Sequence, residues 1–89
     1  MNHFTMRESK THTLKVWPAE FLAIREGRKR FEFRKDDRGF QVGDLLHLHE
    51  WDPSTQKHTN SQGCWTVTYI LRGPDFGVPE GYVVMSIDR

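Results

Sequence analysis

One stretch of this chain, between Pro18 and Gly27, is bounded like a helix, and this limits the fold more than any other feature. Proline is tolerated in a first helical turn, and glycine commonly ends a helix. An apolar stripe of Phe21, Leu22 and Ile24 lies between them, so we expect a helix of about nine residues. A single helix this short cannot enclose a core, which must therefore be built mainly from strands.

Five further segments have the alternation or the composition that is typical of strands. They span residues 12–16, 30–35, 45–51, 64–71 and 82–87. The polar stretch 52–63 is expected to be a mobile hairpin connection, and the Gly/Pro-rich stretch 72–81 a long loop. We therefore predict an α+β fold, a small, partly closed mixed β-barrel of about five or six strands with one short helix after the first strand.

The length of 89 residues fits one domain, which we place at residues 12–89, after a flexible N-terminal arm of residues 1–11. Cys64 is the only cysteine and is expected to be an inert core or edge thiol, so no disulfide can form within the chain. The sequence has neither a long apolar run nor a signal peptide, which favours a cytoplasmic protein that does not enter membranes. We take a monomer as the default and expect no cofactor.

Aromatic and histidine side chains also alternate along the predicted strands. His47 and His49 share one face, but no cysteine pair or helical histidine pair accompanies them, so we expect solvent-facing histidines and no metal site. Trp65 and Tyr69 share a face of a later strand and are expected to belong to the core.

The densest cluster of charge in the chain surrounds two phenylalanines, Phe31 and Phe33. Strand side chains alternate between two faces, so phenylalanines that point into a core leave the neighbouring charges together on the opposite face. That opposite face would carry Arg30, Glu32 and Arg34. A carboxylate between two guanidinium groups, with Lys29 just before them, makes a compact ionic site.

The wider segment 25–38 carries seven cationic side chains and four acidic ones, although the formal net charge of the whole chain is only +1. Forked guanidinium groups suit phosphate. A solvated, salt-bridged strand and turn would show the same pattern, so charge alone leaves both interpretations open.

Four residues of this segment form the spacing Gly-x-Lys-x-x-Glu-x-Arg: Gly27, Lys29, Glu32 and Arg34. This spacing resembles the signature of the ASCH domain, a branch of the PUA-like superfamily. The turn at residues 40–44 resembles the core order of that family, and residues 77–87 are similar to a small subfamily of phage and bacterial ASCH-like proteins. The resemblance covers residues 12–87.

The resemblance implies a PUA-like barrel with a cleft between barrel and helix, and a function in binding RNA or a nucleotide. Lys29 and Arg34 would hold phosphate, and Glu32 would accept a hydrogen bond from an exocyclic amine or a 2′-hydroxyl. We add Arg38 from the basic segment, and Trp17, which either stacks on a base or staples the helix to the core.

Two other functions stay open. Amidohydrolases related to the family, which remove acetyl from acetylated cytidine, resemble this chain at Lys29 but have threonine where Glu32 stands, which argues against that reaction. A hydrolase of another modified nucleoside or of RNA would use Lys29 as a base and Glu32 as a general acid/base. The remaining alternative is a phage-type module that binds a host protein. The loop at 72–81, with Phe76, is expected to form a rim or lid over the cleft.

Overall fold

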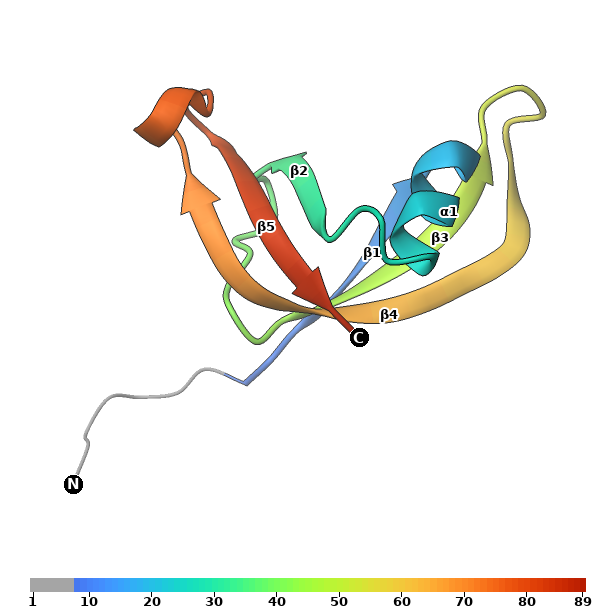
Figure 1. The fold of residues 1–89 in the computed structure, drawn as a ribbon, viewed down its shortest axis with the longest axis horizontal. Coiled ribbons are helices and arrows are strands. Elements are labelled where there is room, and N and C mark those ends of the chain that lie inside the picture. The colour runs from blue at the N-terminus through green and yellow to red at the C-terminus, as the bar shows by residue number, and fades with distance from the viewer. Residues whose placement is uncertain (1–7) are drawn as a thin grey trace.

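The computed structural model describes residues 8–89, which form one strongly curled five-stranded sheet and one α-helix (Figure 1). The elements in chain order are β1 (Thr11–Val16), α1 (Pro18–Arg25), β2 (Phe31–Lys35), β3 (Leu45–Asp52), β4 (Lys57–Arg72), a short 3₁₀ helix η1 (Asp75–Gly77) and β5 (Tyr82–Asp88). The predicted α+β class and the helix after the first strand are confirmed. The N-terminal arm falls mostly outside the described residues, which exclude residues 1–7.

The strand order across the sheet is β1-β3-β4-β5-β2. β1 runs parallel to β3, and the other neighbours are antiparallel. The long strand β4 pairs with β3 over its first part and with β5 over its second part, so it carries the curl of the sheet. In Figure 1, α1 lies on the concave side of the resulting half-barrel.

α1 begins and ends at the residues that its sequence marks. Pro18 has the backbone φ that a helix needs, and the carbonyl of Trp17 accepts the first helical bond, from Phe21 N at 2.8 Å. Gly27 ends the helix in the left-handed region, at φ 79°. The carbonyl of Ala23 accepts hydrogen bonds from the next two backbone N–H groups, and the second of these fixes the position of Lys29.

One apolar core fills the concave side of the sheet. Alternation in β1, β3 and β5 directs every second side chain toward α1, as their burial patterns show. The core consists of Leu14, Val16, Phe21, Ile24, Phe40, Leu46, Leu48, Trp65, Val67, Val83, Met85 and Ile87. Its aromatic members make edge-to-face contacts, such as Phe21 against Trp65 with ring centroids 6.0 Å apart.

Two guanidinium groups join the outer edges of the sheet. Arg34 of β2 donates from Nη2 to the carbonyl of Lys15 at 2.7 Å, and Arg38 donates from Nη1 to the carbonyl of Thr13 at 3.1 Å. Both carbonyls belong to β1, the strand at the opposite end of the sheet order from β2. Side chains thus satisfy edge carbonyls that would otherwise need another strand or water.

A buried carboxylate, Asp44, fixes the turn that leads into β3. It is fully buried and accepts hydrogen bonds from the backbone N–H groups of Lys10 (3.1 Å) and Gln41 (3.0 Å). His12 Nε2 lies 2.8 Å from Asp44 Oδ2, the oxygen that also accepts the hydrogen bond from Gln41, and the His12 ring packs edge-on against Phe40. Asp44 therefore ties the start of β1 to the entry of β3.

The orientation of β2 is the reverse of the predicted one. Glu32 is 3% exposed, whereas Phe31 and Phe33 are 45% and 49% exposed, so the carboxylate and not the phenylalanines faces the inside. Phe33 instead stacks on Tyr82 of β5 on the outer face, with centroids 5.5 Å apart. The inner face of β2 accommodates the carboxylate of Glu32 because Lys29 and Arg34 contact it.

β4 begins earlier than predicted. The polar residues expected to form a mobile connection pair with β3, with His58 opposite Trp51, and the hydroxyl of Thr59 donates to Glu50 at 2.7 Å. A short turn at 53–56 is all that remains of the predicted connection.

The predicted core position of Tyr69 is wrong, while that of Trp65 is confirmed. Trp65 is buried, but Tyr69 is 63% exposed. The register of β4 against β5 shifts between Val67 and Tyr69, and such a bulge reverses the alternation that follows it. Cys64 is exposed, on the face of β4 opposite to Trp65.

Candidate functional site

A cleft of about 230 Å³ opens between the first turn of α1 and the inner face of β2. Its charged lining residues are Lys15, Glu20, Lys29, Glu32 and Arg34, and its aromatic ones are Trp17 and Phe33. We call this the charged cleft. β1, α1, β2 and the connection after α1 each contribute a side chain, so the cleft depends on the curl of the whole sheet.

Glu32 is the buried acid of the charged cleft, and cations hold it from two sides. Its Oε2 accepts a hydrogen bond from Arg34 Nε at 2.7 Å, and its Oε1 lies 3.7 Å from Lys29 Nζ. The second oxygen is therefore held only by a longer ionic contact. Oε1 of Glu32 can therefore accept a further hydrogen bond from a bound ligand.

Lys29 connects the floor of the cleft to its rim. Its ammonium donates to Glu20 Oε1 at 2.7 Å, in addition to its contact with Glu32. The hydrogen bond from Lys29 and its positive charge lower the pKa of Glu20 below the ordinary value of 4.5. The ammonium also lies 5.2 Å from the centre of the Phe31 ring.

Arg34 contacts both the acid of the charged cleft and the backbone of β1. Its Nε meets Glu32 while its Nη2 bonds the Lys15 carbonyl, so the same guanidinium shapes the cleft and closes the sheet edge. A planar guanidinium has five N–H donors, which leaves donors beyond these two contacts for an anion.

Trp17 lies at the rim of the charged cleft and is 60% exposed. It occupies the position before α1, where its side chain makes no capping hydrogen bond. This exposure does not fit the interpretation of Trp17 as a staple against the core. Trp17 therefore gives the cleft an aromatic surface at its mouth.

The structure brings together four of the five predicted ligand-binding residues. Lys29, Glu32, Arg34 and Trp17 line one cleft, whereas Arg38 does not line it and instead binds the β1 carbonyl of Thr13. Sequence reasoning missed Lys15 and Glu20 as lining residues. Glu20 carried a usable signal, since an acid in the first turn of α1 lies close to the basic strand that follows.

The expected lid is not at the cleft. No residue of the 72–81 loop lines the charged cleft, and Phe76 is 90% exposed in η1. The loop is the connection between β4 and β5, which lies away from α1 in Figure 1.

The strand histidines contact one another and not the cleft. His49 stacks on His58 of β4 with centroids 4.1 Å apart, and His47 contacts Thr13 Oγ1 and Gln62. Among residues 8–89, no group of three or more histidine, cysteine or acidic side chains is arranged to hold a metal ion. With eight residues, α1 is shorter than a membrane-crossing helix, and no other helix in this part of the chain meets the length and hydropathy required.

Comparison with known proteins assigns the chain to a family. A protein of Escherichia phage P2, described as an uncharacterised 12.9 kDa protein in the GpA 3′ region, is 49% identical over 43 residues. That match covers 48% of this chain and 39% of the phage protein, so this chain aligns with less than half of that relative. The model of DUF3850, a domain of unknown function, matches residues 11–87. The chain therefore belongs to the DUF3850 family.

Proposed function

We propose that this chain is an RNA- or nucleotide-binding module that takes a nucleoside and its phosphate in the charged cleft. The observation that carries the proposal is Glu32, a buried carboxylate between two cations at the floor of an open cavity. A fully structural ion pair would not need an open cavity with an exposed tryptophan at its mouth.

Each part of the cleft suits one part of a nucleotide. Trp17 offers a ring face for base stacking, an interaction worth about 1–3 kcal/mol per base. Glu32 accepts a hydrogen bond from an exocyclic amine, as carboxylates do from the N4 of cytosine. Lys29 and Arg34 supply positive charge for the phosphate.

The lining favours binding over nucleophilic hydrolysis. None of the described side chains that line the charged cleft carries a hydroxyl, a thiol or an imidazole. These are the groups that most often serve as activated nucleophiles and their bases. The lining of the charged cleft gives no comparable support to the alternative function, binding to a host protein.

We further infer that the DUF3850 fold of this chain is an ASCH-type, PUA-like barrel. Three features support this kinship: the curled mixed sheet, the helix after the first strand, and the Lys29, Glu32 and Arg34 side chains gathered between that helix and the sheet. The resemblance to ASCH domains implies this arrangement.

Replacing Trp17 by alanine is expected to weaken binding of single-stranded RNA by about 5- to 150-fold, the equivalent of about 1–3 kcal/mol for one lost stacking contact. The free energy of unfolding should change by less than about 0.5 kcal/mol, because the side chain is mostly exposed. Fluorescence anisotropy with labelled RNA at low and moderate salt measures the first quantity, and urea unfolding the second.

Tyr69→Ala is the matched control for Trp17→Ala. Tyr69 is an exposed aromatic of similar accessibility that lies outside the charged cleft. Equal affinity of wild type and Trp17→Ala would count against stacking at the cleft. Negligible affinity of the wild type at both salt concentrations would reject RNA as the ligand.

A further inference from the structure

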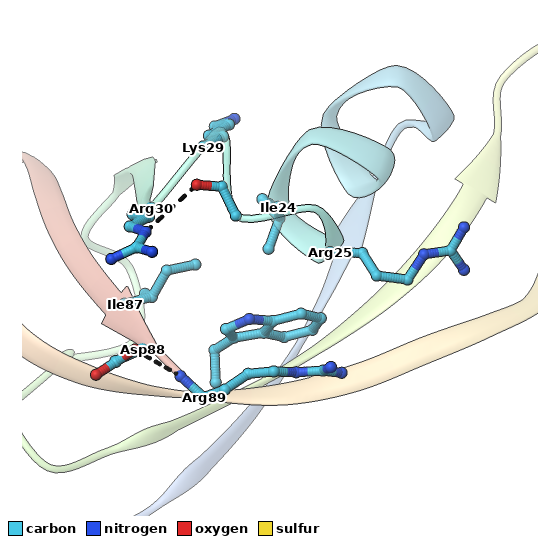
Figure 2. Close-up of a pocket in the computed structure, with 9 residues that line it drawn as sticks. Ile24, Arg25, Lys29, Arg30, Ile87, Asp88 and Arg89 are labelled. Atoms are coloured by element: carbon cyan, nitrogen blue, oxygen red, sulfur yellow. Dashed lines mark hydrogen bonds between the residues drawn. The ribbon is translucent and has the colours of Figure 1, made fainter.

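A second cavity, of about 150 Å³, lies at the other end of α1 (Figure 2). Its floor is apolar and consists of Ile24, Trp65 and Ile87, all of which are buried. Its rim carries the cationic side chains of Arg25, Arg30 and Arg89, and we call it the arginine pocket. In Figure 2 the Arg30 guanidinium lies on one side, and those of Arg25 and Arg89 extend toward the other.

The three arginines have positive charge that no acid neutralises at close range. Among residues 8–89, none of them has a carboxylate within ion-pair distance. Arg89 lies over the Trp65 ring at 4.6 Å, and Arg30 Nε donates to the Gly27 carbonyl at 3.3 Å. Asp88 is the one acid that lines the pocket, and its Oδ1 accepts from the backbone N–H of Arg89.

Unpaired guanidinium groups around a concave, partly apolar surface favour a polyanion with flat or apolar groups between its charges. A single-stranded nucleic acid has this chemistry, because phosphates alternate with sugars and bases. An acidic peptide offers carboxylates on flexible side chains but no such flat groups, so it uses the apolar floor less well.

The two cavities are adjacent at Lys29, which lines both the charged cleft and the arginine pocket. Trp17 and Glu20, at the start of α1, line the cleft, and Ile24 and Arg25, at its end, line the pocket. The eight residues of α1 span about 12 Å at 1.5 Å per residue. A short oligonucleotide covers that span, and a mononucleotide does not.

We propose that the arginine pocket is a phosphate subsite, so that the ligand is a single-stranded oligonucleotide that runs from the charged cleft along α1. This inference rests on the proposed function of the cleft, and it names the ligand more narrowly. The strand places a base beside Trp17 and a phosphate, one or more nucleotides away, between Arg25 and Arg30.

The test compares cytidine monophosphate with a cytidine oligonucleotide of about six residues, a length within the usual range for one small binding domain. The variant is Arg25→Gln combined with Arg30→Gln, which removes two exposed charges from the pocket and none from the cleft. Arg28→Gln is the matched control, since Arg28 lies in the same segment, pairs with Glu26 and lines neither cavity. Thermal unfolding verifies that all variants fold.

In the double variant, we expect the magnitude of the slope of log affinity against log salt for the oligonucleotide to fall by about 0.7, because one phosphate contact is lost. The affinity for cytidine monophosphate should change by less than about twofold, because neither Arg25 nor Arg30 lines the charged cleft and salt screens exposed charges. An oligonucleotide affinity and salt slope that change no more than in Arg28→Gln overturn the phosphate subsite.

Two further results separate this inference from the proposed function. If the wild type binds the oligonucleotide in a way that depends on Arg25 and Arg30 but does not bind cytidine monophosphate, the cleft proposal fails and the subsite stands. If polyglutamate displaces the oligonucleotide as well as unlabelled oligonucleotide does, the pocket is a general acidic-peptide site and the inference is overturned.

Discussion

Replacing Asp44 by alanine is expected to lower the free energy of unfolding by about 3–5 kcal/mol. The carboxylate is fully buried, and its removal leaves the backbone N–H groups of Lys10 and Gln41 and the ring of His12 without their acceptor. Each buried polar group left unsatisfied costs about 1–3 kcal/mol. A small domain has only about 5–15 kcal/mol of total stability, so this loss is a large part of it.

Urea unfolding followed by circular dichroism measures this effect, with Asp37→Ala as the control. Asp37 is an exposed acid whose nearest cation, Arg38, lies 3.8 Å away, so its removal should cost less than about 0.5 kcal/mol. A loss below about 1 kcal/mol in Asp44→Ala would show that the buried network contributes little beyond an ordinary surface contact.

Replacing Glu32 by glutamine is expected to weaken nucleotide binding by about 10- to 150-fold, since a hydrogen bond to a charged group is worth about 1.5–3 kcal/mol. The same change should destabilise the fold by about 2–3 kcal/mol, because Arg34 then loses its charged partner and Lys29 keeps only Glu20. Glutamine keeps the shape of the side chain, so the loss reports on charge and not on packing.

Glu80→Gln is the matched control for Glu32→Gln, since Glu80 is an exposed acid of the loop between η1 and β5 and lines neither cavity. Isothermal titration with cytidine monophosphate gives the affinities, and thermal unfolding gives the stabilities. If Glu32→Gln is destabilised but its affinity for cytidine monophosphate is unchanged, Lys29, Glu32 and Arg34 have a structural role only and do not bind the nucleotide.

The elements of the fold were predictable because their signals are local. Pro18 and Gly27 mark the ends of α1, and the alternation of Leu46 and Leu48 with His47 and His49 gives the faces of β3. These patterns depend on backbone geometry and on one buried face, which a single sequence records directly.

The face of β2 was not predictable in the same way, since alternation gives two faces but not which of them is inside. Apolar residues are normally the inner ones, and this rule assigned Phe31 and Phe33 to the core. In the structure, Glu32 faces inward with Lys29 and Arg34 beside it, and which face of β2 becomes the inner one is decided only by the curl of the sheet around α1. The sequence therefore identified the candidate residues through their spacing but assigned them to the wrong face of β2.

Two other features depend on contacts between distant segments. The bulge that exposes Tyr69 arises where β4 changes its register against β5, which no local pattern marks. Asp44 looked like an ordinary turn residue beside Gly43, and only the approach of Lys10 and His12 makes it a buried anchor. Arg38 joined the candidate site by charge alone, yet its partner is a carbonyl of β1.

The central claim, that the charged cleft receives a nucleotide, is tested most directly by adding cytidine monophosphate to ¹⁵N-labelled protein and following its amide and indole signals. The account predicts saturable shifts that concentrate on the indole N–H of Trp17 and on the amides of Lys29, Glu32 and Phe33. Shifts confined to the outer histidine-bearing face of β3 and β4, or none at all, would contradict it.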